Sequence, residues 1–228
     1  MKKALIPITA ALLTFSILSN SVSAPFVQYY VARFSGSASG WCWIFTEFPM
    51  NESVMPSAYG KGRFDIRGLA IVRKGTDPDF GDYYWANSTD PNTHIWMYRT
   101  QMRVTWGSNA CAVHFWTTDT TVGVFNDTGD YFMIGFFMPM GTTSFAGWYK
   151  EETAPIQFIR GNAVVYVLPY DPSGEVFVVM VVLAIDTTHF LTFIWVSEDI
   201  GGYPPGYVAR SITHRVSVWP IRWAPIPG

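Results

Sequence analysis

The stretch of residues 176–199, VFVVMVVLAIDTTHFLTFIWVSED, places the strongest constraint on what this chain can fold into. Its length suits a membrane-spanning helix, which needs about 20 apolar residues. Asp186 and His189 fall at its centre, however, where an ionisable group costs about 3 kcal/mol or more in lipid. Val, Ile, Phe and Trp favour pleated sheet, and the DTTH tetrapeptide favours a turn because its side chains bond to nearby backbone amides. The segment therefore predicts two adjacent strands joined by a short connection.

The first strand of this pair is apolar on both of its faces. Successive side chains of a strand point to opposite sides, and every residue from 176 to 185 is apolar. A sandwich needs only one apolar face per sheet, so the second face requires a cover of its own. Residues 109–154 of the same chain and a neighbouring subunit are both compatible with that role. In the second case we expect self-association, for example by residues 25–34 adding a strand to a neighbour's sheet edge.

Strand patterns recur along the rest of the chain, separated by Gly-, Pro-, Asn- and Asp-rich turns. Patterns at residues 26–34 and 41–48 flank the Gly/Ser segment SGSASG. In residues 62–75 apolar and polar residues alternate, and residues 94–106 are predicted as one strand. The inward positions predicted for these two segments are Phe64, Ile66, Ala70 and Val72, and then Trp96, Tyr98, Met102 and Val104. The pattern predicts an all-β, antiparallel sandwich of the jelly-roll or immunoglobulin-like style.

The N-terminus has the layout of a secretory signal peptide. Two Lys residues precede a short apolar stretch, and small residues end at position 24. We therefore expect residues 1–24 to be removed and residues 25–228 to form one β-sandwich domain, with an insertion at about 109–154. The mature protein is expected outside the cell or at its surface, with no stable transmembrane span.

Charge and composition narrow the class of partner. The mature chain has 13 basic and 17 acidic residues, and no basic run along the sequence points to nucleic acid. Charged residues make up 14% of the chain, against about 25% in ordinary soluble domains. This composition suggests a surface that is partly covered by glycans or by another chain. Sequons for N-glycosylation occur at Asn51, Asn87 and Asn126.

The chain has two cysteines, Cys42 and Cys111. A disulfide is the default expectation for two cysteines in an exported protein. Closing the loop between them would add roughly 4 kcal/mol of stability in the chain-entropy model. Two buried free thiols are the alternative.

Three groups of residues match a known family in their order along the chain. They are Gly60, Lys61 and Phe64, then Gly161, Asn162 and Ala163, and finally Asp186, Ile194 and Asp199. In this order the chain resembles a loosely defined β-sandwich domain that is common at the surface of secreted bacterial proteins and also found in archaeal ones. The resemblance spans residues 35–199 with a break at 109–154. It implies the fold and an extracellular setting, and it implies no catalytic residues.

Motifs for catalysis are sparse. The G-x-S-x-G elbow, H-E-x-x-H, C-x-x-C and the phosphate-binding loop do not occur. Glu47, Glu175 and Glu198 are the carboxylates to consider for a glycoside hydrolase, but each sits near a strand end, where surface carboxylates are usual. Ten Trp and twelve Tyr residues could stack on sugar rings, although Trp96, Trp116 and Trp195 fall at positions that favour burial.

The segment DPDFGD contains the densest group of possible metal ligands. Asp77, Asp79 and Asp82 offer the carboxylate oxygens that Ca²⁺ prefers, but their spacing differs from the EF-hand loop. A calcium site and a plain hairpin loop both fit this segment, and no other cofactor is expected. The sequence as a whole predicts a secreted, non-enzymatic surface module that associates with itself or another surface protein. The alternative is a secreted carbohydrate-binding protein or a jelly-roll glycoside hydrolase.

Overall fold

The computed structural model describes residues 28–46, 55–78, 81–126, 132–135, 143–169, 175–199 and 206–221. Within these ranges the chain is built from thirteen antiparallel strands and contains no helix, so the predicted all-β, sandwich-like fold is confirmed. No helix in the described part of the chain has the length and apolar character needed to cross a membrane. The N-terminal segment 1–24, predicted as a signal peptide, lies outside the described residues.

The strands follow one another with short connections. They are β1 (Tyr29–Phe45), β2 (Ala58–Asp77), β3 (Gly81–Asn87), β4 (His94–Met97), β5 (Gln101–Trp106), β6 (Asn109–Trp116), β7 (Val122–Asn126), β8 (Phe132–Gly135), β9 (Thr143–Lys150), β10 (Gln157–Pro169), β11 (Phe177–Ala184), β12 (Phe190–Val196) and β13 (Ala209–Ile221).

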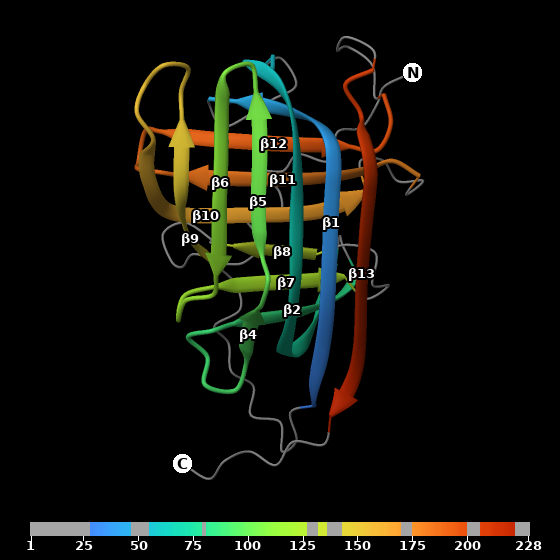
Figure 1. Cartoon of the computed structure of the whole chain (residues 1–228). Helices are drawn as coiled ribbons and strands as arrows, with labels where there is room; N and C mark the ends of the chain where they lie inside the picture. The colour runs from blue at the N-terminus through green and yellow to red at the C-terminus, as the bar shows by residue number, and fades with distance from the viewer. Residues whose placement is uncertain are drawn as a thin grey trace.

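The strands form two layers that cross each other (Figure 1). In the front layer β13, β1, β2, β5, β6 and β9 run upright, and behind them β12, β11, β10, β8 and β7 run crosswise. Crossed layers are one of the two usual ways in which sheets pack face to face. The two layers are joined by hydrogen bonds where β1 pairs with β12 and where β9 pairs with β10. β3 joins them as well, because it pairs with β2 of the front layer and with β7 of the back layer. Since β2 also pairs with β1, the strand order that starts at β1 leads back to β1.

The first strand is longer than the sequence pattern predicts. The segment SGSASG, expected to separate two strands, lies inside β1 and pairs with β13 on one side and β2 on the other. The strand irregularity falls at Ser39 and Gly40, and Gly40 has a φ of 104° that favours glycine. Small residues suit this stretch because Gly36 is packed under the side chain of Ile66.

Residues 176–199 form the predicted hairpin of β11 and β12. The connection carries the expected turn chemistry: Asp186 Oδ1 accepts hydrogen bonds from the backbone N–H groups of Thr188 and His189, at 2.7 and 2.8 Å. Oδ2 lies 2.6 Å from His189 Nδ1. These hydrogen bonds, that from the Thr188 amide foremost, hold the pKa of the Asp186 carboxyl well below its usual range.

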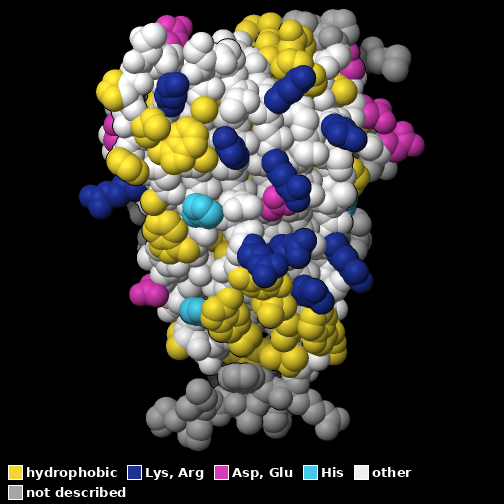
Figure 2. Space-filling model, in the orientation of Figure 1, with side chains coloured by type: hydrophobic (Ala, Val, Ile, Leu, Met, Phe, Trp, Pro, Cys, Tyr) yellow, Lys and Arg dark blue, Asp and Glu magenta, His cyan; other side chains and the backbone are white. Residues whose placement is uncertain are grey.

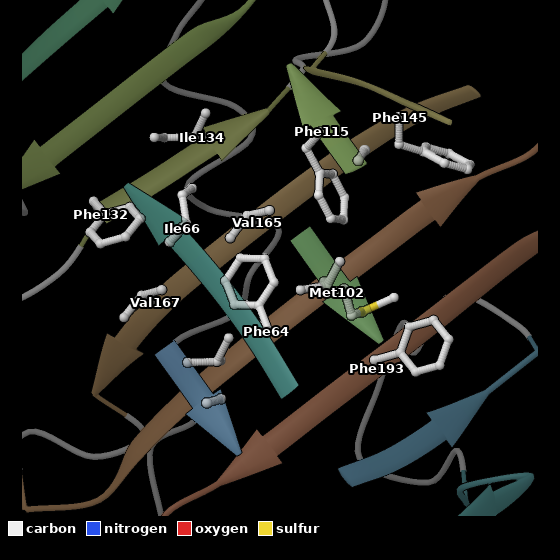
Figure 3. Packing of buried hydrophobic residues seen from close by; sticks show 14 of the residues in the cluster. Phe64, Ile66, Met102, Phe115, Phe132, Ile134, Phe145, Val165, Val167 and Phe193 are labelled. Atoms are coloured by element: carbon white, nitrogen blue, oxygen red, sulfur yellow. The ribbon is translucent and has the colours of Figure 1, made fainter. Parts of the chain in front are cut away.

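The main core lies between the two layers (Figure 3). Phe64, Ile66, Ala70 and Val72 are fully buried, as the alternation in β2 predicts. The Phe64 ring is 6.1 Å from that of Phe115 in the front layer. It is also 6.4 Å from the Trp195 ring, which β12 supplies from behind. The crossing of the layers therefore places large aromatic rings from both at the centre.

Both faces of β11 are buried. Val181 and Leu183 are fully buried in the main core, while Met180 and Val182 on the opposite face are 6% and 2% exposed in a second cluster with Val164. The single chain provides this burial, so a neighbouring subunit is not needed to cover the face. Residues 29–34, considered for strand donation to a neighbour, pair with β13 on one edge and with β2 on the other within the same chain.

Residues 109–154, expected to be an insertion, supply β6, β7, β8 and β9. β6 pairs with β5, and β9 pairs with β10. β7 and β8 connect β3 to β10. The described residues of this segment are therefore part of the two layers themselves.

Candidate functional site

The acidic segment considered for calcium is a hairpin connection between β2 and β3. Asp77 lies opposite Gly81 and Thr76 opposite Asp82, while Asp79 lies outside the described residues. Asp82 is already engaged, because Lys74 Nζ is 2.6 Å from its Oδ2 and Thr76 Oγ1 donates to its Oδ1 at 2.7 Å. These bonds, that from Lys74 foremost, lower the pKa of the Asp82 carboxyl. Among the described residues, no group of three or more His, Cys, Asp or Glu side chains is placed to hold a metal ion.

The predicted disulfide between Cys42 and Cys111 is not formed. Both thiols are free and fully buried, and burial raises the pKa of each to about 12. Cys42 lies on β1 and Cys111 on β6, with β2 and β5 between them in the sheet. Three strand spacings amount to about 14 Å, whereas a disulfide needs Cα atoms within about 7 Å. The sheet order therefore explains why two cysteines of an all-β chain are not partners.

The three sequons differ in their surroundings. Asn87 is half-buried at the end of β3, and its Oδ1 accepts hydrogen bonds from the backbone N–H and hydroxyl of Thr89. Asn126 is 8% exposed at the end of β7, so its amide is hardly accessible in the folded protein. Asn51 lies outside the described residues.

The aromatic residues expected in the core divide into two groups. Trp195 is fully buried, as predicted, but Trp96 and Trp116 are 45% and 44% exposed. The predicted strand 94–106 is in fact two strands, β4 and β5, interrupted where Arg99 has a φ of 56°. This left-handed residue breaks the alternation, so Tyr98 is exposed while Met102 and Val104 are buried as expected.

The front layer presents a strongly basic outer face. Residues directly opposite each other on paired strands point to the same side, and the registers of β13, β1, β2 and β5 align outward-pointing basic residues. We call this set the basic face; it consists of Arg33, Lys61, Arg63, Arg67, Arg103 and Arg215, all exposed. Figure 2 shows Lys and Arg side chains across the middle of this side, with a hydrophobic area below them.

Acidic side chains are nearly excluded from this face. Asp65 is the one Asp or Glu among the outward positions between these basic residues; the next acidic residue along β2, Asp77, lies at the strand's end in the β2–β3 hairpin. It is held by its neighbour Arg63, whose Nε and Nη2 lie 2.5 and 2.9 Å from the two carboxylate oxygens. The basic face cannot be recognised from sequence runs, because its residues come from strands far apart in the chain. The available signal was the even spacing of Lys61, Arg63 and Arg67, two and four residues apart, which places them on one side of a strand.

A hollow of about 470 Å³ opens in this face over β2, β5, β6 and β9. The registers line up Arg63, Arg103, Ala112 and Trp148 on successive strands. Ala112 is the small residue of this row, so a trough about two strand spacings wide, roughly 10 Å, separates Arg103 from Trp148. We call it the arginine hollow. Gln101 and His114 line the same hollow in the next row.

A second hollow of about 320 Å³ lies further along β2 and β5. Trp41, Tyr59 and Trp106 line it together with Lys61, whose Nζ is 4.5 Å from the centre of the Trp41 ring. Tyr207 stacks on Tyr59 with ring centres 4.1 Å apart. Burial, with a smaller contribution from Tyr207, raises the pKa of the Tyr59 hydroxyl. We call this the aromatic hollow.

The remaining histidines are dispersed. His94 packs against Trp96 with ring centres 4.3 Å apart, and His214 packs against Phe177 at 4.0 Å. His189 belongs to the β11–β12 turn. Glu175 and Glu198, considered for glycoside hydrolysis, are exposed next to the β11–β12 hairpin, away from both hollows, and Glu47 lies outside the described residues.

Fold and surface together define an all-β protein with a basic, hollowed sheet face. Comparison with known proteins adds no relative: no family model, no curated protein and no solved structure matches the chain.

Proposed function

We propose that this chain is an exported, non-enzymatic interaction module that binds an anionic partner through its basic face. The observation that carries the proposal is the placement of six basic side chains, with one carboxylate among them, on the outward side of one layer. The whole chain has a net charge of −2, so this face differs in sign from the molecule as a whole. Such segregation creates a local positive potential that attracts and orients an anionic partner.

The identity of the basic residues supports the same function. Five of the six are arginines, whose planar guanidinium groups donate paired hydrogen bonds to carboxylate, sulfate or phosphate oxygens. Arginine is also enriched at the centres of protein interfaces. On a surface without a partner, gathering these charges has a cost in stability, because like charges on paired strands repel each other.

The chemistry of the arginine hollow suits recognition better than proton transfer. Its one carboxylate, Asp65, is bound on both oxygens by Arg63, and a guanidinium does not titrate in the physiological range. The one carboxylate of the hollow is therefore committed to an ion pair with Arg63. This is our reason for proposing a binding module in preference to an enzyme.

Retention on polyanion columns tests the proposal. Purified protein is applied to immobilised heparin and to immobilised polyglutamate, and eluted with a salt gradient. The wild type should be retained on both, and Arg67→Gln should elute at clearly lower salt. Lys74→Gln changes the net charge equally but lies in the β2–β3 region beside Asp82, so it should elute like the wild type. Equal behaviour of the two variants, or no retention of the wild type, would reject the basic face as a binding surface.

Export is a separate part of the proposal and has its own test. Expressed in a secreting host, the protein recovered outside the cells should begin near residue 25 when its intact mass is measured. An intact N-terminus on cell-retained protein would contradict export.

A further inference from the structure

We infer that the anionic partner is a linear acidic polysaccharide, which lies along β2 and β5 and occupies both hollows. This inference rests on the proposed function and specifies its ligand class. It depends on the way in which the two hollows combine charge, aromatic rings and hydrogen-bonding groups.

The arginine hollow contains the groups that an acidic sugar requires. Trp148 forms one wall and offers an apolar ring face, on which a pyranose ring can stack through its C–H groups. Arg103 lies across the trough, about 10 Å away over Ala112, where its guanidinium can bind a carboxylate or sulfate carried by that ring. The small side chain of Ala112 leaves the space between them open. A methyl group on Gly147 would collide with the carbonyl oxygen of Ala112, so the close packing of β6 and β9 below the trough requires glycine.

Polar groups in the hollow are mixed, which favours a sugar over a nucleic acid. Asp65 accepts hydrogen bonds, Gln101 both donates and accepts, and His114 adds a ring nitrogen. Hydroxyl groups of a sugar satisfy such a mixture because each both donates and accepts. A phosphate backbone, in contrast, offers only acceptors and so provides no donor for the Asp65 carboxylate, whereas the ring hydroxyls of an acidic sugar do.

The two hollows form one continuous track. Lys61 of the aromatic hollow and Arg63 of the arginine hollow are two residues apart on β2, and Thr105 and Arg103 have the same spacing on β5. Two residues of a strand span about 7 Å, so adjacent parts of one chain molecule can reach both hollows. In the aromatic hollow Trp41 provides a second ring face and Lys61 a second cation. The repeated pairing of an aromatic ring with a cation matches a polymer whose repeating unit is a charged ring.

Titration calorimetry with defined oligosaccharides tests the inference. The probes are a galacturonic acid hexamer and a heparin hexasaccharide, with cellohexaose as the uncharged control. Single-stranded DNA and vesicles containing anionic phospholipid serve as competing polyanions. The wild type should bind at least one acidic hexamer and should not bind cellohexaose. Tighter binding of the DNA or the vesicles than of either acidic hexamer would overturn the inference.

A charge-neutral variant separates this inference from the proposed function. Trp148→Ala removes the stacking surface and leaves every charge in place, so we expect affinity for the acidic hexamer to fall at least tenfold while retention on polyglutamate is unchanged. Trp219→Ala is the matched control, because Trp219 is 42% exposed on β13 outside both hollows. Equal losses in the two variants, or unchanged hexamer binding by Trp148→Ala, would reject the sugar track while leaving anion binding by the basic face intact.

A second variant checks the geometry of the cation. Arg103→Lys keeps the charge but removes the planar fork, so hexamer affinity should fall several-fold. Full affinity in this variant would show that the hollow recognises charge alone and would contradict a dedicated sugar site.

Discussion

Arg63 on β2 lies directly opposite Arg103 on β5, and both side chains point out of the front layer. Like charges at directly opposed positions destabilise a sheet. Asp65 offsets part of this repulsion by binding Arg63 through two hydrogen bonds, but it makes no such bond to Arg103. The Arg63–Arg103 pair therefore destabilises the folded state locally. It lies at the position where we place the acidic group of the ligand.

This relationship predicts that Arg103→Thr stabilises the protein. Removing the charge relieves the repulsion, and Thr suits a strand, so the free energy of unfolding should rise by about 0.2–1 kcal/mol. Arg33→Thr is the control, because Arg33 lies directly opposite Leu69 and Ser217 and so has no directly opposed like charge to lose. Urea denaturation of both variants measures the difference. A lower unfolding midpoint for Arg103→Thr than for Arg33→Thr would show that the arginine pair carries no strain.

The core at the crossing of the layers should be sensitive to truncation of Phe64. This side chain is fully buried between Phe115 and Trp195, so Phe64→Ala should cost about 3–5 kcal/mol. Phe158→Ala removes the same atoms from a ring that is 91% exposed, and its effect should stay within about 0.5 kcal/mol. Thermal or urea unfolding distinguishes the two. Similar stabilities of the two variants would contradict the packing of the two layers around Phe64.

The two thiols should be free but unreactive in the folded protein. Both are fully buried, and burial raises the pKa of Cys42 and of Cys111 to about 12, so little thiolate exists at pH 8. Iodoacetamide should label neither thiol in native protein and both in urea without any reductant. Intact-mass measurements count the labels. A thiol pair that becomes labelled only after reduction would restore the disulfide that the sequence predicts.

The same two thiols make stability depend on alkaline pH. Each folded-state pKa lies above the ordinary value of 9.0, so the folded chain holds these protons more tightly than the unfolded chain. Their contribution is complete below pH 9 and is lost as the pH rises toward 12. At pH 10.5 each thiol should cost about 2 kcal/mol relative to pH 8.

The variant Cys42→Ala isolates one of these contributions. Its unfolding free energy should fall by about 2 kcal/mol less than that of the wild type between pH 8 and pH 10.5. Urea denaturation at both pH values provides the comparison, and the lower starting stability of the variant cancels in the difference. An identical decrease in both proteins would show that Cys42 is not buried as a thiol.

Local patterns in the sequence were sufficient to predict individual strands and turns. Unbroken apolar character with Asp186 at the turn predicts the β11–β12 hairpin. Alternation in β2 predicts that the side of the strand carrying Phe64 and Ile66 faces the core. These predictions hold because period and turn chemistry are properties of neighbouring residues. The alternation predicted for residues 94–106 fails at Arg99, where one left-handed residue changes the side on which the following side chains lie.

The pairing of the strands was decided only by the tertiary structure. Which strands are neighbours, and in what register, depends on contacts between residues far apart in the chain, and nothing near Cys42 specifies that β2 and β5 separate it from Cys111. The same registers bring Arg215, Arg63 and Arg103 to one face, although the sequence has no basic run. The sequence therefore determined that this protein is built of strands, because strand formation is a local property. The position of its charged surface follows from a register that only the packed layers fix.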